Sequence, residues 1–199
     1  MQVLLIDGHP DSGRLSSALL DRYEKALPAD VVVKRVAVRD LTFDPNMRQG
    51  YAVDQVWEPD LQSLAEILLD ADHVIFAFPL WWGAEPALLK GLLDRLLLPG
   101  HAFRYHTDDP MWDKLLVGRS ADVIITMDTP PWYLRLIYGD AVVTRWKKQI
   151  LGFVGFAPIR FFRFGPTNRG GAARAFAVWA SQLEWAAASI ATLRRKPKL

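Results

Sequence analysis

The chain has 199 residues, with 24 lysines and arginines against 22 aspartates and glutamates, which gives a formal net charge of +2. Half of its residues are apolar (51%), so an intrinsically disordered chain is excluded, and the length fits one domain with a sizeable core. The near-neutral charge predicts no nucleic-acid partner, and the absence of cysteine excludes disulfides, thiolate metal sites and a cysteine nucleophile.

Both ends of the chain carry further signals. The first apolar run, at 3–6, lacks a basic flank and is too short for a signal peptide, and no stretch reaches the roughly 18 apolar residues of a membrane-spanning helix. We therefore expect a cytoplasmic protein. A dense basic cluster at about 194–199 predicts a short disordered tail after a single domain.

Apolar runs of β-branched residues alternate along the chain with segments in which apolar residues recur every three or four positions. In chain order, we expect a strand at 3–6, a helix at 15–27, a strand at 31–38, a helix at 61–69, a strand at 73–78, a helix at 87–98, a strand at 122–126, a strand within 153–164 and a helix at 172–193. This alternation predicts an α/β protein whose parallel sheet is covered by helices on both faces.

The loop after the first strand predicts a phosphate site, because ligands of such sheets bind beyond the carboxyl ends of the strands. Glycines at 8 and 13 allow a tight turn, and the N–H groups at the start of a helix attract an anion. The alternative is an ordinary helix cap made by Ser12 or Ser16. The spacing of Gly8 and Gly13 is that of a P-loop, but Arg14 and Leu15 replace the lysine and hydroxyl that it requires, so we expect a metal-free phosphate site.

The loop after the third strand carries the most specific motif of the chain. It reads Phe78-Pro79-Leu80-Trp81-Trp82-Gly83 and continues with Pro86-Ala87-Leu88-Leu89-Lys90-Gly91-Leu92-Leu93-Asp94-Arg95. This stretch resembles the flavodoxin-like NAD(P)H:quinone oxidoreductase family. Further matches are Gly8-His9-Pro10, Asp40-Leu41, Phe43-Asp44-Pro45 and the run from Gly100 to Tyr105, so the resemblance extends over nearly the whole chain.

The resemblance implies a three-layer flavodoxin-like fold with a five-stranded parallel sheet, and a homodimer that carries either FAD or FMN. It also implies two-electron, ping-pong transfer from NAD(P)H to a quinone or a similar flat aromatic acceptor. Three loops would hold the flavin. Their candidate residues are His9, Arg14, Leu15, Ser16 and Ser17, then Pro79, Leu80, Trp81, Trp82 and Gly83, then Thr126, Met127, Asp128 and Thr129.

The loop after the fourth strand departs from the family pattern. Pro130 and Pro131 stand where relatives have a glycine-rich turn, and Trp132 and Tyr138 align with a Tyr and a His that stabilise reduced flavin. The catalytic candidates are therefore Trp132, Tyr133 and Tyr138, none of which titrates near neutral pH as histidine does. Asp128 either caps this turn or contacts the flavin. No pairing of the histidines with carboxylates suggests a metal site, so none is expected.

The same residues are compatible with two other functions. One is an electron-carrier flavodoxin, although such carriers are strongly acidic and this chain is not. The other is a regulatory flavoprotein subunit of a potassium-efflux type transporter, for which the basic tail would meet a protein partner at the membrane. The choices between NADH and NADPH, between FAD and FMN, and among acceptors are also open.

Overall fold

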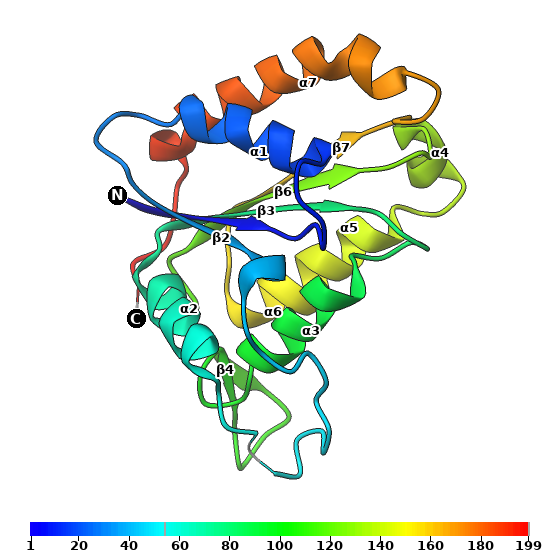
Figure 1. The fold of residues 1–199 in the computed structure, drawn as a ribbon. Coiled ribbons are helices and arrows are strands. Elements are labelled where there is room, and N and C mark those ends of the chain that lie inside the picture. The colour runs from blue at the N-terminus through cyan, green and yellow to red at the C-terminus, as the bar shows by residue number, and fades with distance from the viewer. Residues whose placement is uncertain (54, 199) are drawn as a thin grey trace.

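The computed structural model describes residues 1–53 and 55–198, which form a twisted parallel sheet with helices on both faces (Figure 1). Its strands are β1 (Gln2–Asp7), β2 (Val32–Ala37), β3 (His73–Pro79), β6 (Ser120–Thr126) and β7 (Ile159–Phe164), in the order β2-β1-β3-β6-β7. The predicted α/β class and the five parallel strands are confirmed. The chain passes from β1 outward to β2 and then crosses to β3, so the strand order reverses between β1 and β3.

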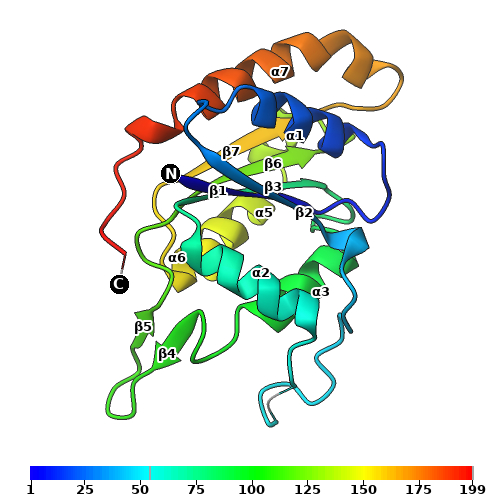
Figure 2. The ribbon, with the colours of Figure 1, turned by 60° about the vertical axis from the view of Figure 1, so that its left-hand side comes forward.

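The helices divide between the two faces of the sheet (Figures 1 and 2). One face carries α1 (Leu15–Lys25) and α7 (Gly171–Ala188), which pack against each other. The other face carries α2 (Pro59–Asp70), α3 (Ala87–Leu96), α5 (Ala141–Arg145) and α6 (Leu151–Val154).

Alternation along β1 shows why both faces are covered. Val3 and Leu5 belong to the core under α1 and α7, and Leu4 and Ile6 belong to the core under α2 and α3. All four side chains are buried, so each face of the strand requires its own layer of helices.

Several short elements lie outside the predicted pattern. They are the helix α4 (Pro131–Leu136), the strands β4 (Phe103–Tyr105) and β5 (Trp112–Lys114) of an antiparallel hairpin, a π-helical turn at Trp146–Ile150, and 3-10 turns at Val38–Asp40 and Ile190–Thr192. Each is too short to show a hydrophobic period. The expected fifth strand begins only at Ile159, because the first residues of the run at 153–164 complete α6.

The last helix ends at Ala188, five residues before the expected boundary at 193. The hydroxyl of Ser189 donates a hydrogen bond to the carbonyl of Ala186 at 2.9 Å, and Arg160 donates to the same carbonyl at 2.9 Å. These contacts satisfy the terminal carbonyl group and so end the helix where apolar periodicity alone would continue it.

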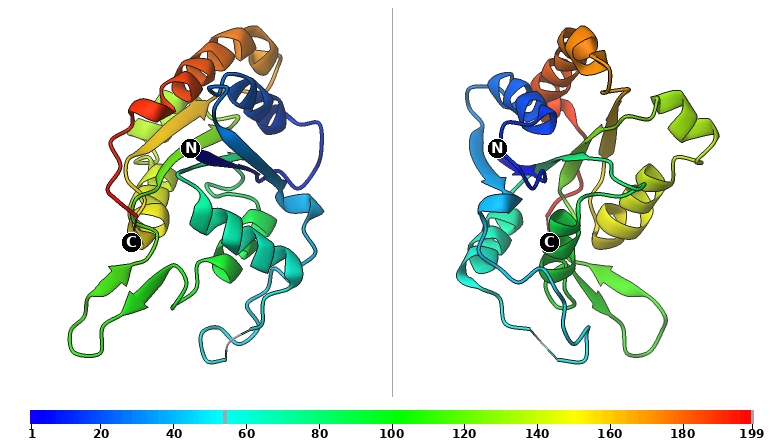
Figure 3. Two further views of the ribbon diagram at one scale, coloured as in Figure 1. Left: turned by 90° about the vertical axis from the view of Figure 1, so that its left-hand side faces the viewer. Right: turned by 45° about the vertical axis from the view of Figure 1, so that its right-hand side comes forward.

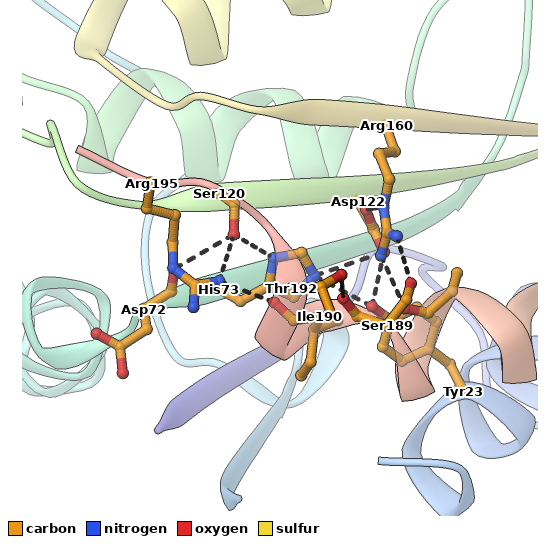
Figure 4. Close-up of polar contacts among 11 residues, drawn as sticks. Tyr23, Asp72, His73, Ser120, Asp122, Arg160, Ser189, Ile190, Thr192 and Arg195 are labelled. Atoms are coloured by element: carbon orange, nitrogen blue, oxygen red, sulfur yellow. Dashed lines mark hydrogen bonds and ion pairs between the residues drawn. The ribbon is translucent and has the colours of Figure 1, made fainter. Parts of the chain in front are cut away.

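A buried polar network joins the elements at the amino edge of the sheet (Figure 4). Asp122 lies at its centre and accepts hydrogen bonds from the Tyr23 hydroxyl at 2.6 Å and from both Arg160 Nε and Nη2, at 2.7 and 2.6 Å. Burial opposes ionisation of Asp122, but hydrogen bonds from His73 and Arg160 outweigh it and hold the pKa of this carboxyl below its ordinary value. The same burial, with the neighbouring carboxylate, raises the pKa of the Tyr23 hydroxyl.

The basic segment at the C-terminus contacts this amino edge. Arg195 donates to Ser120 Oγ at 3.2 Å, and Lys198 pairs with Asp72 at 2.9 Å. Within the described residues, no helix combines the length and apolar character that a membrane crossing demands.

Candidate functional site

A cleft of about 430 Å³ lies at the carboxyl edge of the sheet, where the strand order reverses. Its volume is within the range of small-molecule sites. Residues from the three predicted loops line it, and so does part of the β7–α7 loop. They are His9, Arg14, Leu15, Ser16, Pro79, Leu80, Trp81, Thr126, Met127, Asp128, Thr129, Thr167 and Ala172.

The structure brings together eleven of the fourteen predicted cofactor residues at this cleft. The other three are Ser17, Trp82 and Gly83. Ser17 is buried behind the cleft, and Trp82 and Gly83 form the exposed tip of the second loop.

The first loop is built around the buried carboxylate of Asp7, the last residue of β1. Its Oδ2 accepts hydrogen bonds from Ser17 Oγ at 2.6 Å and from Arg39 Nη1 at 2.8 Å, and Oδ1 accepts from the N–H of His9 at 3.2 Å. The same Arg39 nitrogen donates to the carbonyl of His9 at 3.2 Å. The loop is thus fixed by charge-assisted bonds before any ligand binds.

The start of α1 carries an unpartnered hydroxyl. Arg14 is the N-cap of this helix and no side chain caps it, so the capping interpretation of Ser12 and Ser16 is wrong. Within the described part of the chain, Ser16 Oγ is buried and has no hydrogen-bond partner. A buried hydroxyl without a partner is costly, and an anion at the free N–H groups of this helix would satisfy it. These residues therefore fit a phosphate.

The environment of His9 in the first loop favours the neutral form of its ring. The ring Nδ1 of His9 lies 2.9 Å from the N–H of Asp11 and accepts from it, so the proton of the neutral ring is on Nε2. Burial lowers the pKa of His9 below its ordinary value. Arg14 pairs with Asp11, and this hydrogen bond lowers the pKa of the Asp11 carboxyl.

The second loop forms a tight two-residue turn. The N–H and carbonyl groups of Trp81 and Ala84 bond to each other at 2.8 and 3.0 Å. Trp82 has a φ of 52° and Gly83 a φ of 78°, which are the left-handed values of a type I′ turn. Trp82 is fully exposed, whereas Trp81 lines the cleft with its ring 5.6 Å from that of His9. Of these two predicted cofactor residues, the structure therefore places only Trp81 in the lining of the cleft.

The third loop joins the second at the floor of the cleft. Leu80 donates its N–H to the carbonyl of Thr126 at 2.8 Å, and Met127 donates to Phe164 of β7 at 2.9 Å. Asp128 accepts a hydrogen bond from Thr167 Oγ1. Asp128 does not cap α4, whose N-cap is Pro130 without a side-chain bond; its carboxylate pairs instead with the loop that follows β7.

The three catalytic candidates lie together on and after α4, outside the lining of the cleft. Their rings contact edge to face, with centroids 5.5 Å apart for Trp132 and Tyr133 and 5.2 Å apart for Tyr133 and Tyr138. Trp132 and Tyr138 are exposed, and Tyr133 is half-buried. This aromatic cluster of Trp132, Tyr133 and Tyr138 therefore lies outside the lining of the cleft, and its exposed rings are free to contact another molecule.

Sequence reasoning missed the contribution of the β7–α7 loop and two ion pairs, each formed by a buried carboxylate and an arginine next to the predicted loops. Thr167 and Ala172 follow the fifth strand, so the rule that selected the other loops also applies to them. The missed charges are Asp7, Arg39, Glu85 and Arg145. Nothing in local spacing pairs Asp7 with Arg39, because parallel pairing of β1 and β2 brings them together.

Comparison with known proteins agrees with this architecture. The family model described as flavodoxin-like fold matches residues 1–188. An uncharacterised NAD(P)H oxidoreductase of Haemophilus influenzae is 33% identical over 134 residues, covering 64% of this chain and 64% of that protein, which is just under two thirds of its length.

Two further likenesses extend over more of the chain. An FMN-dependent NADH:quinone oxidoreductase of Cereibacter sphaeroides is 29% identical over 75% of this chain and 78% of its own. The structure of an NAD(P)H:quinone oxidoreductase from Methanothermobacter marburgensis superposes with a TM-score of 0.79 over 96% of this chain and 97% of that one; at 20% identity it shows the shared fold. With the family model spanning all five strands of the sheet and all three loops, the chain belongs to the family of proteins with the flavodoxin-like fold.

Proposed function

We propose that the protein is a flavin-dependent oxidoreductase that carries FMN and transfers two electrons from NAD(P)H to a quinone or a similar flat aromatic acceptor. The observation that carries this proposal is the cleft at the strand reversal, which is lined by Ser16, whose buried hydroxyl has no partner among the described residues, and by Trp81 of the Trp81–Ala84 turn. The FMN dependence of the Cereibacter relative supports FMN over FAD.

The phosphate end of the cleft would be held by the first loop. Ser16 Oγ, the N–H groups at the start of α1 and the Nε2–H of His9 are donors, and Arg14 supplies a positive charge nearby. Because Asp7 and Arg39 already fix this loop, it loses little conformational freedom when the phosphate binds.

The ring end would be held by the second and third loops. In a two-residue turn the N–H groups of the two central residues make no bond within the turn, so those of Trp82 and Gly83 are free to face a flavin edge. Backbone dipoles fixed in this way stabilise negative charge on a reduced ring. The chemistry that a bound flavin supplies is hydride acceptance from NAD(P)H and electron delivery to the acceptor. A single slot at this cleft would admit the electron donor and the acceptor in turn, which favours a ping-pong order.

A homodimer is part of the proposal. Large apolar side chains are exposed beside the cleft, and a second copy would cover them and close the slot. These residues are Trp82, Trp132, Leu136, Ile137 and Tyr138. Light scattering on a sizing column should give twice the mass of the chain.

The test begins with the absorbance spectrum of the purified protein, after incubation with FMN and with FAD in separate samples. Stopped-flow mixing with NADH or NADPH under anaerobic conditions should bleach the flavin, and a benzoquinone should restore its colour. A preparation that binds neither flavin overturns the proposal. A bound flavin that NAD(P)H does not reduce indicates an electron carrier instead.

A further inference from the structure

A buried carboxylate joins the second loop to the helices that follow the third. Glu85 comes directly after the Trp81–Ala84 turn, and its side chain has no exposed surface. Its Oε2 accepts hydrogen bonds from Arg145 and from Trp146 Nε1, the latter at 2.9 Å. Arg145 is the last residue of α5, so the ion pair spans 60 positions of the sequence.

The segment that this ion pair holds begins directly after the third loop and ends at a contact with the residue that follows the second loop. We call residues 130–145 the α4 arm; it contains α4, the aromatic cluster and α5. The arm begins one residue after Thr129, which lines the cleft, and its last residue Arg145 pairs with Glu85, which is four residues after Trp81, another lining residue. In Figure 3 its α4 portion projects beyond the carboxyl ends of the strands.

A second ion pair holds the arm at its middle. Asp140, between α4 and α5, pairs with Arg163 of β7 and donates its N–H to the carbonyl of Leu134 at 3.0 Å. Asp140 has a φ of 53°, the left-handed region that a residue with a side chain adopts at a cost. The arm is therefore attached both to the edge strand and to the second loop.

These two carboxylates are poorly explained by stability alone. Glu85 Oε1 and Asp140 Oδ1 are both buried and have no hydrogen-bond partner among the described residues. A buried carboxylate oxygen without a partner is destabilising, and a buried ion pair is often no more stable than apolar side chains of the same volume. A requirement for a fixed position of the arm accounts for both pairs.

We propose that Glu85 is a positioning residue for the acceptor slot. By binding Arg145 and Trp146, it fixes the aromatic cluster of the α4 arm at a set distance from the Trp81–Ala84 turn, so that the two sides of the slot keep the width of a flat ring. Trp146 makes this connection rigid because its ring stacks on Phe78 of β3, with centroids 4.8 Å apart. The proposal rests on the function proposed above.

The test compares Glu85→Gln with Asp122→Asn. Glutamine keeps an oxygen that accepts from Trp146 but cannot neutralise Arg145. Asp122 is an equally buried carboxylate that pairs with an arginine at the opposite edge of the sheet. Its variant therefore reports the effect of losing a buried ion pair that does not hold the α4 arm. Hydrogen exchange of the amides of residues 132–145 is measured first, without substrates. In Glu85→Gln these amides should exchange about tenfold faster than in the wild type, and in Asp122→Asn at the wild-type rate.

Steady-state kinetics give the second readout. Glu85→Gln should raise the KM for a benzoquinone about tenfold while kcat changes much less, and flavin content should stay at the wild-type level. Adding Arg145→Gln to Glu85→Gln should recover thermal stability without recovering KM. Equal exchange in the two single variants, or an unchanged KM, overturns the proposal. A wild-type protein that reduces no quinone would refute the proposed function, whereas the exchange comparison would still report on the anchoring of the arm.

Discussion

The hydroxyl of Ser17 donates a 2.6 Å hydrogen bond to the buried carboxylate of Asp7, which ties the first turn of α1 to the end of β1. Arg39 binds the same oxygen from the segment after β2. Three elements of the chain, β1, α1 and the 3-10 turn at Val38–Asp40, therefore meet at one buried charge directly behind the first loop, and the geometry of that loop depends on this charge.

Replacing Asp7 should affect both stability and flavin binding. Asp7→Asn leaves the Arg39 guanidinium without its buried counter-charge, so the free energy of unfolding should fall by about 3 kcal/mol and flavin should bind more weakly. Urea unfolding and a flavin titration measure the two effects. Asp40→Asn is the control, because Asp40 is an exposed partner of the same arginine at 3.9 Å and its loss should cost less than about 0.5 kcal/mol. Equal losses in the two variants would contradict the central role of Asp7.

Ser16 and Ser17 are neighbours with opposite expected roles. Ser16→Ala removes a buried hydroxyl that has no partner among the described residues, so the stability of the flavin-free protein should not fall. Its affinity for FMN should drop about tenfold, and its affinity for riboflavin, which lacks the phosphate, should stay the same. Ser17→Ala should instead lower the free energy of unfolding by about 1 kcal/mol through the lost bond to Asp7. An equal loss of affinity for FMN and riboflavin in Ser16→Ala would show that the phosphate does not bind at Ser16.

Trp82 combines a left-handed φ of 52° with a fully exposed side chain. Asparagine followed by glycine is the preferred pair for a type I′ turn, so Trp82→Asn should raise the free energy of unfolding by roughly 0.5–1 kcal/mol. Quinone turnover should fall in the same variant. Because the exposed ring contributes no packing in the described residues, a gain of stability together with a loss of turnover would show that the Trp82 side chain contributes to the reaction. Thermal unfolding and steady-state rates distinguish this from a neutral surface residue, for which turnover would not change.

The β4–β5 hairpin should respond to pH through His106. Hydrogen bonds to Asp109 at 2.9 Å and Asp113 at 3.2 Å raise the pKa of His106 above its ordinary 6.5. A raised pKa in the folded state means that this contribution to stability is complete below pH 6.5 and is lost as the pH rises through the folded-state pKa. Proton NMR titration of the ring should show the raised pKa, and Asp113→Asn should move it back toward 6.5. A pKa below 6.5 in the wild type would show that these carboxylates do not bind the ring in solution.

The sequence predicts the parallel sheet and most of the cleft because both depend on local signals. The buried strands are apolar runs, and the loop after each strand is found by reading a few residues onward, as with Ser16 and Trp81. The α4 arm was not predicted, since α4 and α5 are shorter than a hydrophobic period can reveal. Glu85 was missed for a different reason. Its partner Arg145 is 60 residues away, and only the packed structure brings the two charges together.

The network at the amino edge has a practical consequence. Arg195 reaches the sulfur of Met1 at 3.3 Å, so both described ends of the chain emerge side by side on the rim opposite the cleft. A tether or a fused domain at either end would therefore leave the mouth of the cleft pointing away from the attachment. Immobilisation on an electrode or bead through these ends should preserve the approach of small molecules, whereas attachment through the exposed aromatic residues of the α4 arm should block it.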